Sequence, residues 1–225
     1  GGILEASNTI EGSALRGHAG IESGDRCDVL TSEADSFRAN VYGLLARLLT
    51  EPPSDETMQI LRDLDGMDDG TEICKALANL GSVAVRTPVG KAEEEYTSLF
   101  YGHGAGGEIH PYASFYLTGF IYEKPLAEIR ADLSEIGIEP TGRTSEPEDH
   151  IAFLFEVMCG LVTGGFGGVP NLGRQRAFFT KHLAPWAGLM LKDLEAASSA
   201  AFYMPVGALG RLFLAVEAEA FEMAA

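Results

Sequence analysis

The sequence from residue 145 to residue 155 reads Ser145-Glu146-Pro147-Glu148-Asp149-His150-Ile151-Ala152-Phe153-Leu154-Phe155. Ser145 and Glu148 form a capping-box pattern, in which each side chain accepts a hydrogen bond from the backbone amide of the other residue. Proline fits the first turn of a helix because the amides there have no helical acceptor, and acids there suit the positive end of the helix dipole. The pattern predicts a helix that begins at Ser145 and carries an acidic cluster and an imidazole at the edge of a core.

This stretch alone has two interpretations. It is either a well-made helix start with no further role, or a binding site built from three carboxylates and a histidine, and short motifs of this kind often occur by chance. Two other motifs precede it and favour the second interpretation. Residues 95–100 read Glu-Tyr-Thr-Ser-Leu-Phe, and residues 110–116 read His-Pro-Tyr-Ala-Ser-Phe-Tyr. A loop with four glycines in six residues, 102–107, lies between them.

In this order, an aromatic-x-x-Leu-Phe helix, a glycine-rich loop, Pro-Tyr-x-Ser-x-Tyr and Glu-Pro-x-Asp-His resemble the TorD/DmsD/NarJ family. The resemblance covers about residues 30–215, and the pentad at 146–150 is its most specific part. One departure is Gly102-His103, where the family pattern often has Gly-Pro, so the shape of this loop is not carried over. The resemblance implies a cytoplasmic chaperone that binds the twin-arginine leader and the apo-form of a molybdenum-cofactor redox enzyme. It would assist cofactor insertion and assembly before export.

The same motifs supply the candidate residues for leader binding. Carboxylates pair with guanidinium groups through charge-assisted hydrogen bonds, and aromatic rings attract cations and apolar side chains. We expect polar contacts from Glu146, Asp149 and His150, with Pro147 fixing the turn. The second group of candidates is Tyr96, Tyr112, Ser114 and Tyr116. Two of these residues have an alternative: His150 could cap or bridge inside the fold, and Tyr96 could pack in the core or present its hydroxyl at a groove edge.

The charge of the chain limits its partners. The formal net charge of its 225 residues is −17. A nucleic-acid backbone requires cationic side chains, and anionic membrane surfaces attract basic segments, so both partners are disfavoured. A negative surface field attracts cationic partners instead, although solubility alone explains most of such a charge.

The cysteines and the apolar runs indicate a compartment. Cys27, Cys74 and Cys159 are widely separated and form no C-x-x-C pair, which fits a reducing environment. The apolar runs are too short to span a bilayer, and the start of the sequence shows no export signal. We therefore expect a cytoplasmic protein without membrane insertion.

Apolar residues recur at helical spacing along most of the chain. We expect helices over about residues 30–50, 54–64, 71–80, 87–100, 124–136, 145–162, 172–183, 185–197 and 202–223. The sequence shows neither the alternation typical of strands nor a fixed-period repeat. The prediction is an all-α fold, a single TorD-like helical bundle of about nine to ten helices.

The chain also suggests a domain organisation. Residues 1–27 are rich in glycine with little apolar periodicity, so we expect a flexible N-terminal tail before an all-helical domain over 28–225. Residues 137–145 read Gly-Ile-Glu-Pro-Thr-Gly-Arg-Thr-Ser, and these turn-forming residues predict a hinge. Because hinges permit exchange of segments between protomers, both a monomer and a domain-swapped dimer are open.

An enzyme or a metal site is the alternative to a binding protein. Asp149 and His150 beside Glu146 would suit acid–base chemistry, so the alternative function is a small hydrolase or a nucleotide-dependent enzyme. However, no Gly-x-Ser-x-Gly elbow and no phosphate loop occurs, and we assign no catalytic residue. Glu146 and His150 would provide two metal ligands with help from His103 or His110, but nothing fixes the geometry that a metal requires. We expect neither a metal nor a resident cofactor.

Overall fold

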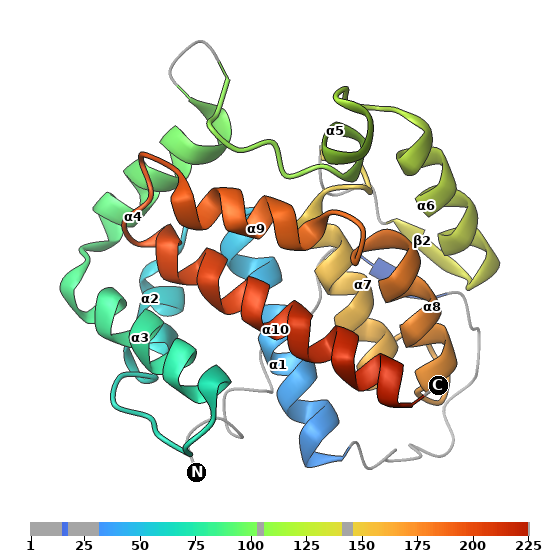
Figure 1. The fold of residues 1–225 in the computed structure, drawn as a ribbon, viewed down its shortest axis with the longest axis horizontal. Coiled ribbons are helices and arrows are strands. Elements are labelled where there is room, and N and C mark those ends of the chain that lie inside the picture. Colours follow the sequence, from blue (N-terminus) through green and yellow to red (C-terminus); the bar gives the residue numbers. More distant parts are fainter. Residues whose placement is uncertain (1–14, 18–31, 103–105, 141–145, 225) are drawn as a thin grey trace. The chain divides into compact units, whose positions relative to one another are not determined.

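The computed structural model describes residues 15–17, 32–102, 106–140 and 146–224. Helices dominate these residues (Figure 1), which confirms the all-α prediction. The α-helices are α1 (Glu33–Thr50), α2 (Asp55–Arg62), α3 (Glu72–Arg86), α4 (Val89–Tyr96), α5 (Ala113–Thr118), α6 (Lys124–Glu135), α7 (Ile151–Thr163), α8 (Leu172–His182), α9 (Ala187–Ala196) and α10 (Tyr203–Met223). A π-helix, η2 (Thr97–Tyr101), continues α4, and two short strands, β1 (Leu15–Gly17) and β2 (Ile138–Pro140), complete the set.

The chain divides into two compact units. The first comprises Gly1–Ala46 and Tyr112–Leu183, and the second comprises Arg47–Pro111 and Ala184–Ala225. Most of the predicted flexible tail, 1–14 and 18–27, lies outside the described residues, as do residues 141–145 of the predicted hinge. The hinge and the choice between a monomer and a swapped dimer therefore stay predictions.

The core of the first unit is built around α7. This helix is apolar on nearly every side, as expected of a helix buried all round, and eight of its residues are buried. Tyr42 of α1 lies against Phe155 of α7 with their ring centroids 5.8 Å apart. On another side α7 packs against α8, whose Phe178 and Phe179 are buried.

The second unit is held together by α10. Figure 1 shows α9 and α10 side by side, and α10 also packs against α3. The close approach of α9 and α10 depends on Gly207, because a Cβ atom there would lie 2.6 Å from the Leu191 carbonyl oxygen and 2.8 Å from the Glu195 nitrogen. Any larger residue at this position would force the two helices apart.

Some local elements differ from the sequence-based expectation. Residues 113–118, where no helix was expected, form the short helix α5, and the end of the helix expected over 87–100 is the π-helix η2. Thr87, the first residue of that expected helix, instead ends α3, and its hydroxyl donates to the Val83 carbonyl at 2.8 Å. The strands β1 and β2, not expected at all, pair antiparallel with Leu15 opposite Pro140.

Candidate functional site

The helix after the acidic stretch begins later than predicted. α7 starts at Ile151, and His150 is its N-cap because the His150 Nδ1 atom accepts a hydrogen bond from the Ala152 amide at 3.2 Å. The preceding residues form a turn closed by the His150 amide, which donates to the Pro147 carbonyl at 3.0 Å. The expected N-cap, Ser145, lies outside the described residues, and the capping-box prediction is wrong for the start of α7.

This turn joins the start of α5 to the start of α7. Tyr112 and His150 pair as an isolated antiparallel bridge, and their rings meet edge to face with centroids 5.3 Å apart. The Tyr112 hydroxyl donates to Glu146 Oε2 at 2.5 Å. We call this group the α5–α7 junction; its members are Tyr112, Ser114, Glu146, Asp149 and His150. The structure therefore brings together five of the residues predicted from separate motifs, with Pro147 buried in the connecting turn.

Asp149 fixes the start of α5. Its side chain is fully buried. Its Oδ2 atom accepts a hydrogen bond from the Ser114 amide at 2.9 Å, and its backbone carbonyl accepts one from the Ala113 amide at 3.0 Å. The residue at the N-cap of α5, Tyr112, makes no side-chain capping bond, so the Asp149 carboxylate takes the place of a cap from 35 residues away. Among the described residues, Asp149 Oδ1 is buried without a hydrogen-bond partner.

His150 is buried as a neutral ring. Burial lowers the pKa of its imidazole from 6.5 to about 4, because a charged ring would lose its hydration. Its Nδ1 atom acts as an acceptor toward the Ala152 amide, which a protonated ring is unable to do. Near neutral pH, His150 therefore contributes a helix cap and an aromatic edge, and it carries no positive charge.

The lowered pKa predicts a pH-dependent stability. Well above pH 6.5 the ring is neutral in both states; as the pH falls through 6.5 toward about 4, the unfolded chain takes up a proton that the folded chain excludes. Stability is therefore lost across this window, by roughly 2 kcal/mol at pH 4.5. His150→Asn keeps an oxygen for the cap but does not titrate there. In urea unfolding at pH 7.5 and 4.5, acidification should lower the free energy of unfolding of the variant by about this much less than that of the wild type. Parallel losses in both proteins would contradict the account.

The carboxylates at the outer edge of the junction differ in their partners. Glu146 is half-buried and accepts the Tyr112 hydroxyl. Glu148, which belongs to the predicted acidic cluster but not to the expected leader contacts, is also half-buried and pairs with Arg130 of α6 at 2.7 Å. Sequence reasoning missed Arg130 because nothing local connects α6 to the turn at 147–150. Arg130 is 56% exposed at its side chain, so this ion pair contributes little stability.

The other two predicted tyrosines belong to different units. The Tyr116 amide donates to the carbonyl of Tyr112, a junction residue, at 3.2 Å. Tyr116 of α5 is half-buried, with its ring edge to face with Phe115 at 5.7 Å. Tyr96 belongs to the second unit, where it is 2% exposed and its hydroxyl donates to the Leu49 carbonyl at 3.4 Å. Its ring also lies 5.9 Å from that of Tyr203. These contacts give Tyr96 a packing role, and a contact with a leader peptide stays a prediction.

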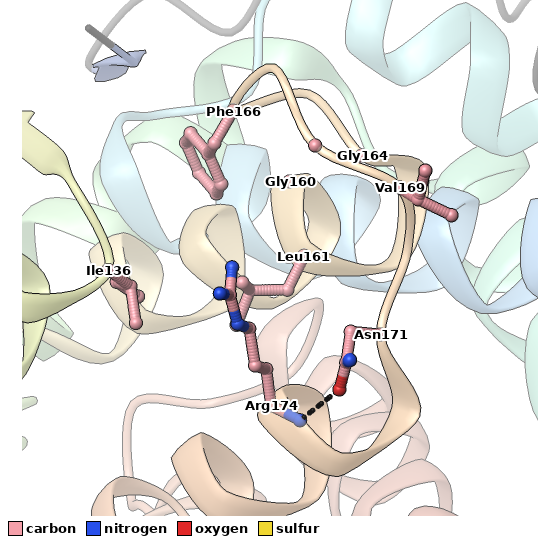
Figure 2. Close-up of a pocket in the computed structure, with 9 residues that line it drawn as sticks. Ile136, Gly160, Leu161, Gly164, Phe166, Val169, Asn171 and Arg174 are labelled. Carbon is pink, nitrogen blue, oxygen red and sulfur yellow. Dashed lines mark hydrogen bonds between the residues drawn. The ribbon is translucent and has the colours of Figure 1, made fainter.

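A shallow hollow lies elsewhere in the first unit, between the ends of α6 and α7 and the start of α8 (Figure 2). Its lining is mostly glycine and apolar side chains, and Arg174 extends from α8 toward α7 within it. None of the lining residues is a carboxylate, so the hollow is unsuited to cations. The lining residues are Ile136, Gly160, Leu161, Gly164, Phe166, Gly168, Val169, Asn171 and Arg174.

The described residues offer little for metal chemistry or for a membrane. Within 15–17, 32–102, 106–140 and 146–224, no three His, Cys, Asp or Glu side chains gather in a way that would hold a metal ion. His103, one of the ligands considered from the sequence, lies outside these residues. No helix in the same ranges has the length and apolar character needed to cross a membrane.

Comparison with known proteins identifies the family. The family model for the nitrate reductase delta subunit matches residues 67–192, which is more than half of the chain. No curated protein sequence matches significantly. Among solved structures, a protein from Archaeoglobus fulgidus described as a redox enzyme maturation protein is similar, with a TM-score of 0.51 and 18% sequence identity. That similarity covers 88% of this chain and 98% of the other, and at this identity it concerns the fold.

The family match decides between the two functional classes that the sequence left open. Nitrate reductase delta subunits of the NarJ/TorD type are maturation chaperones and not catalytic enzymes, so the hydrolase alternative is not supported. The chain therefore belongs to the nitrate reductase delta subunit family, and it is a redox enzyme maturation chaperone whose partner is a redox enzyme.

Proposed function

We propose that this chaperone binds the twin-arginine leader of a molybdenum-containing oxidoreductase precursor in the cytoplasm, and that it holds the apo-protein until the cofactor is inserted. The observation that carries the proposal is the α5–α7 junction, where a half-exposed carboxylate lies beside aromatic rings within one compact unit. Candidate clients are reductases for trimethylamine oxide, dimethyl sulfoxide or nitrate, and formate dehydrogenases.

Glu146 is the residue that we propose contacts an arginine directly. A carboxylate offers about four acceptor positions on two oxygens, and the Tyr112 hydroxyl occupies one of them. Enough capacity remains for a guanidinium group to form two parallel hydrogen bonds. The ring of Tyr112, and that of Tyr116 one helical turn later, provide faces over which the delocalised cation would stack.

The buried members of the junction hold the contacting residues in position. Asp149, His150 and Ser114 are at most 7% exposed and bond to neighbouring backbone groups. In the proposal they position Glu146 and Tyr112, and Pro147 sets the direction of the turn. A direct contact from Asp149 would require the junction to open; its second oxygen, which has no partner in the described residues, would then accept an arginine N–H.

A peptide titration tests the proposal. The probes are two synthetic leaders, one with adjacent arginines before an apolar segment and one with lysines in their place. Arginine should be preferred because lysine lacks the planar fork that pairs with a carboxylate. Glu146→Gln keeps an acceptor for the Tyr112 hydroxyl but removes the charge, so it should bring the affinity for the arginine peptide close to that for the lysine peptide. Glu148→Gln is the matched control, because Glu148 already pairs with Arg130, and it should keep the preference.

A further inference from the structure

The last turn of α5 and the loop that joins it to α6 expose several large apolar side chains. Leu117, Phe120, Ile121 and Tyr122 are 46%, 70%, 46% and 65% exposed. We call these four residues the α5–α6 knuckle. Single exposed apolar residues are common, but a contiguous group of them marks a surface that contacts another molecule.

Hydrogen bonds of Ser114 and Thr118 fix the backbone of the knuckle. The Glu123 amide donates to the Ser114 hydroxyl at 3.2 Å, and the Thr118 hydroxyl donates to the Ser114 carbonyl at 2.8 Å. The Gly119 amide donates to the Phe115 carbonyl at 2.8 Å. Because Ser114 is itself fully buried beside Asp149, the loop is anchored to the junction. An apolar surface that is already ordered loses little conformational entropy when it binds.

Tyr122 adopts a backbone conformation that its side chain disfavours. Its φ is +62°, and no other non-glycine residue in the described part of the chain has a positive φ. A bulky residue in this region costs on the order of 1 kcal/mol or more, which glycine would avoid. The strain places an aromatic ring on the surface, where it is 65% exposed and adds little to the core. A strained residue at an exposed position favours a role in binding.

The charges near the knuckle indicate its occupant. Glu123 is exposed directly after it, and the next residue, Lys124, pairs with Glu128 at 3.1 Å. In the turn joined to the other end of α5, Glu148 pairs with Arg130, and Glu146 is the carboxylate beside Tyr112. A second copy of this chain would itself carry a formal net charge of −17, and repulsion between like charges disfavours self-association. The surface instead fits a peptide that combines cationic and apolar side chains.

We propose that the knuckle binds the apolar segment of the leader peptide while Glu146 binds the arginines, an inference that rests on the proposed function. The six residues of α5 span about 9 Å. An extended peptide covers that length with roughly three residues. The apolar segment should therefore contact the knuckle when it begins about three residues from the basic pair.

The experiment measures binding of two fluorescent peptides by anisotropy. Both carry two arginines; one has an apolar segment and the other has serines in its place. The wild-type chain should bind the apolar peptide at least tenfold more tightly, since exposed aromatic anchors of this kind dominate binding energy. The double variant Phe120→Ser with Tyr122→Gly should lose the tenfold preference for the apolar peptide. It should bind the serine peptide with the wild-type affinity. Val85→Ser, at a 53% exposed position of α3, should behave like the wild type.

The possible outcomes distinguish failure of the knuckle inference from failure of the leader-binding proposal. If the wild type binds both peptides equally, or if the double variant keeps full affinity for the apolar peptide, the knuckle inference is overturned and the leader-binding proposal stands. If the wild type binds neither peptide, both are overturned. Circular dichroism and urea unfolding check that the variant is folded, and Phe120→Ser alone repeats the measurement with Tyr122 unchanged. We expect Tyr122→Gly to be at least as stable as the wild type.

Discussion

Replacing Glu95 with alanine is expected to lower the free energy of unfolding by about 4 kcal/mol. The Glu95 carboxylate of α4 accepts three backbone hydrogen bonds at the start of α10, from the amides of Ala201 at 2.8 Å, Phe202 at 3.0 Å and Tyr203 at 2.7 Å. The N-cap residue of α10, Phe202, supplies no side-chain cap. Glu95 therefore accepts from the first amide of a 21-residue helix and from the two amides just before it, and it places a negative charge at the positive end of the helix dipole.

Urea unfolding of three variants tests this role. Glu95→Gln should be intermediate, because its amide oxygen can replace Oε1, which accepts two of the three bonds, but not Oε2. Glu94→Ala is the matched control: Glu94 forms a surface ion pair with Lys91, both side chains being 68% exposed, and its loss should cost less than about 0.5 kcal/mol. Equal stabilities of Glu95→Ala and Glu94→Ala would show that the three bonds do not stabilise the fold.

Asp149→Ala is expected to cost about 3 kcal/mol, because it leaves the Ser114 amide buried without an acceptor. The loss should be concentrated in α5, whose first turn depends on that carboxylate. Hydrogen exchange provides a local readout: the Ser114 amide should exchange much faster in the variant, while amides in the middle of α10 should be affected only through the loss of global stability.

Asp149→Asn is the matched control for this prediction. Its side-chain oxygen can still accept the hydrogen bond from the Ser114 amide, so the variant should lose only about 1 kcal/mol and should keep Ser114 protected. If the free energy of unfolding of Asp149→Ala lay within about 0.5 kcal/mol of the wild-type value, the carboxylate would not be the cap of α5. The alanine variant should also bind leader peptide more weakly, since α5 carries Tyr112 at one end and the knuckle at the other.

Most helices were predictable because their signals are local. α1, α6, α8, α9 and α10 begin and end within about three residues of the expected ranges, since an apolar stripe of helical spacing needs only nearby residues to be recognised. The turn at Gly137 was also recognisable; its φ of +74° is the left-handed conformation that favours glycine after a helix.

The elements that were missed depend on distant residues. α5 has six residues, too few for a periodic signal, and Asp149, which caps it, lies 35 residues away. The strands β1 and β2 have three residues each and are more than 100 residues apart. The start of α7 was placed too early because two caps were possible, and the contacts of His150 decide between them.

The candidate site was predictable as a set of residues but not as a set of roles. Two of the three motifs led to Tyr112, Ser114 and the pentad, which the structure brings together. The motif at 95–100 led to Tyr96, which belongs to the second unit. Their division into half-buried Glu146 and Tyr112 and buried Asp149 and His150 is set by packing against the rest of the unit. Neither the knuckle nor the strain at Tyr122 has a local sequence signal that distinguishes it from an ordinary loop.

The most direct test of the central claim is the affinity of the intact wild-type chain for the twin-arginine leader relative to its twin-lysine counterpart, measured at physiological ionic strength. The account predicts that the arginine peptide binds at least about tenfold more tightly, a difference of about 1.4 kcal/mol. Equal affinities for the two peptides, or no binding of the arginine peptide, would contradict it.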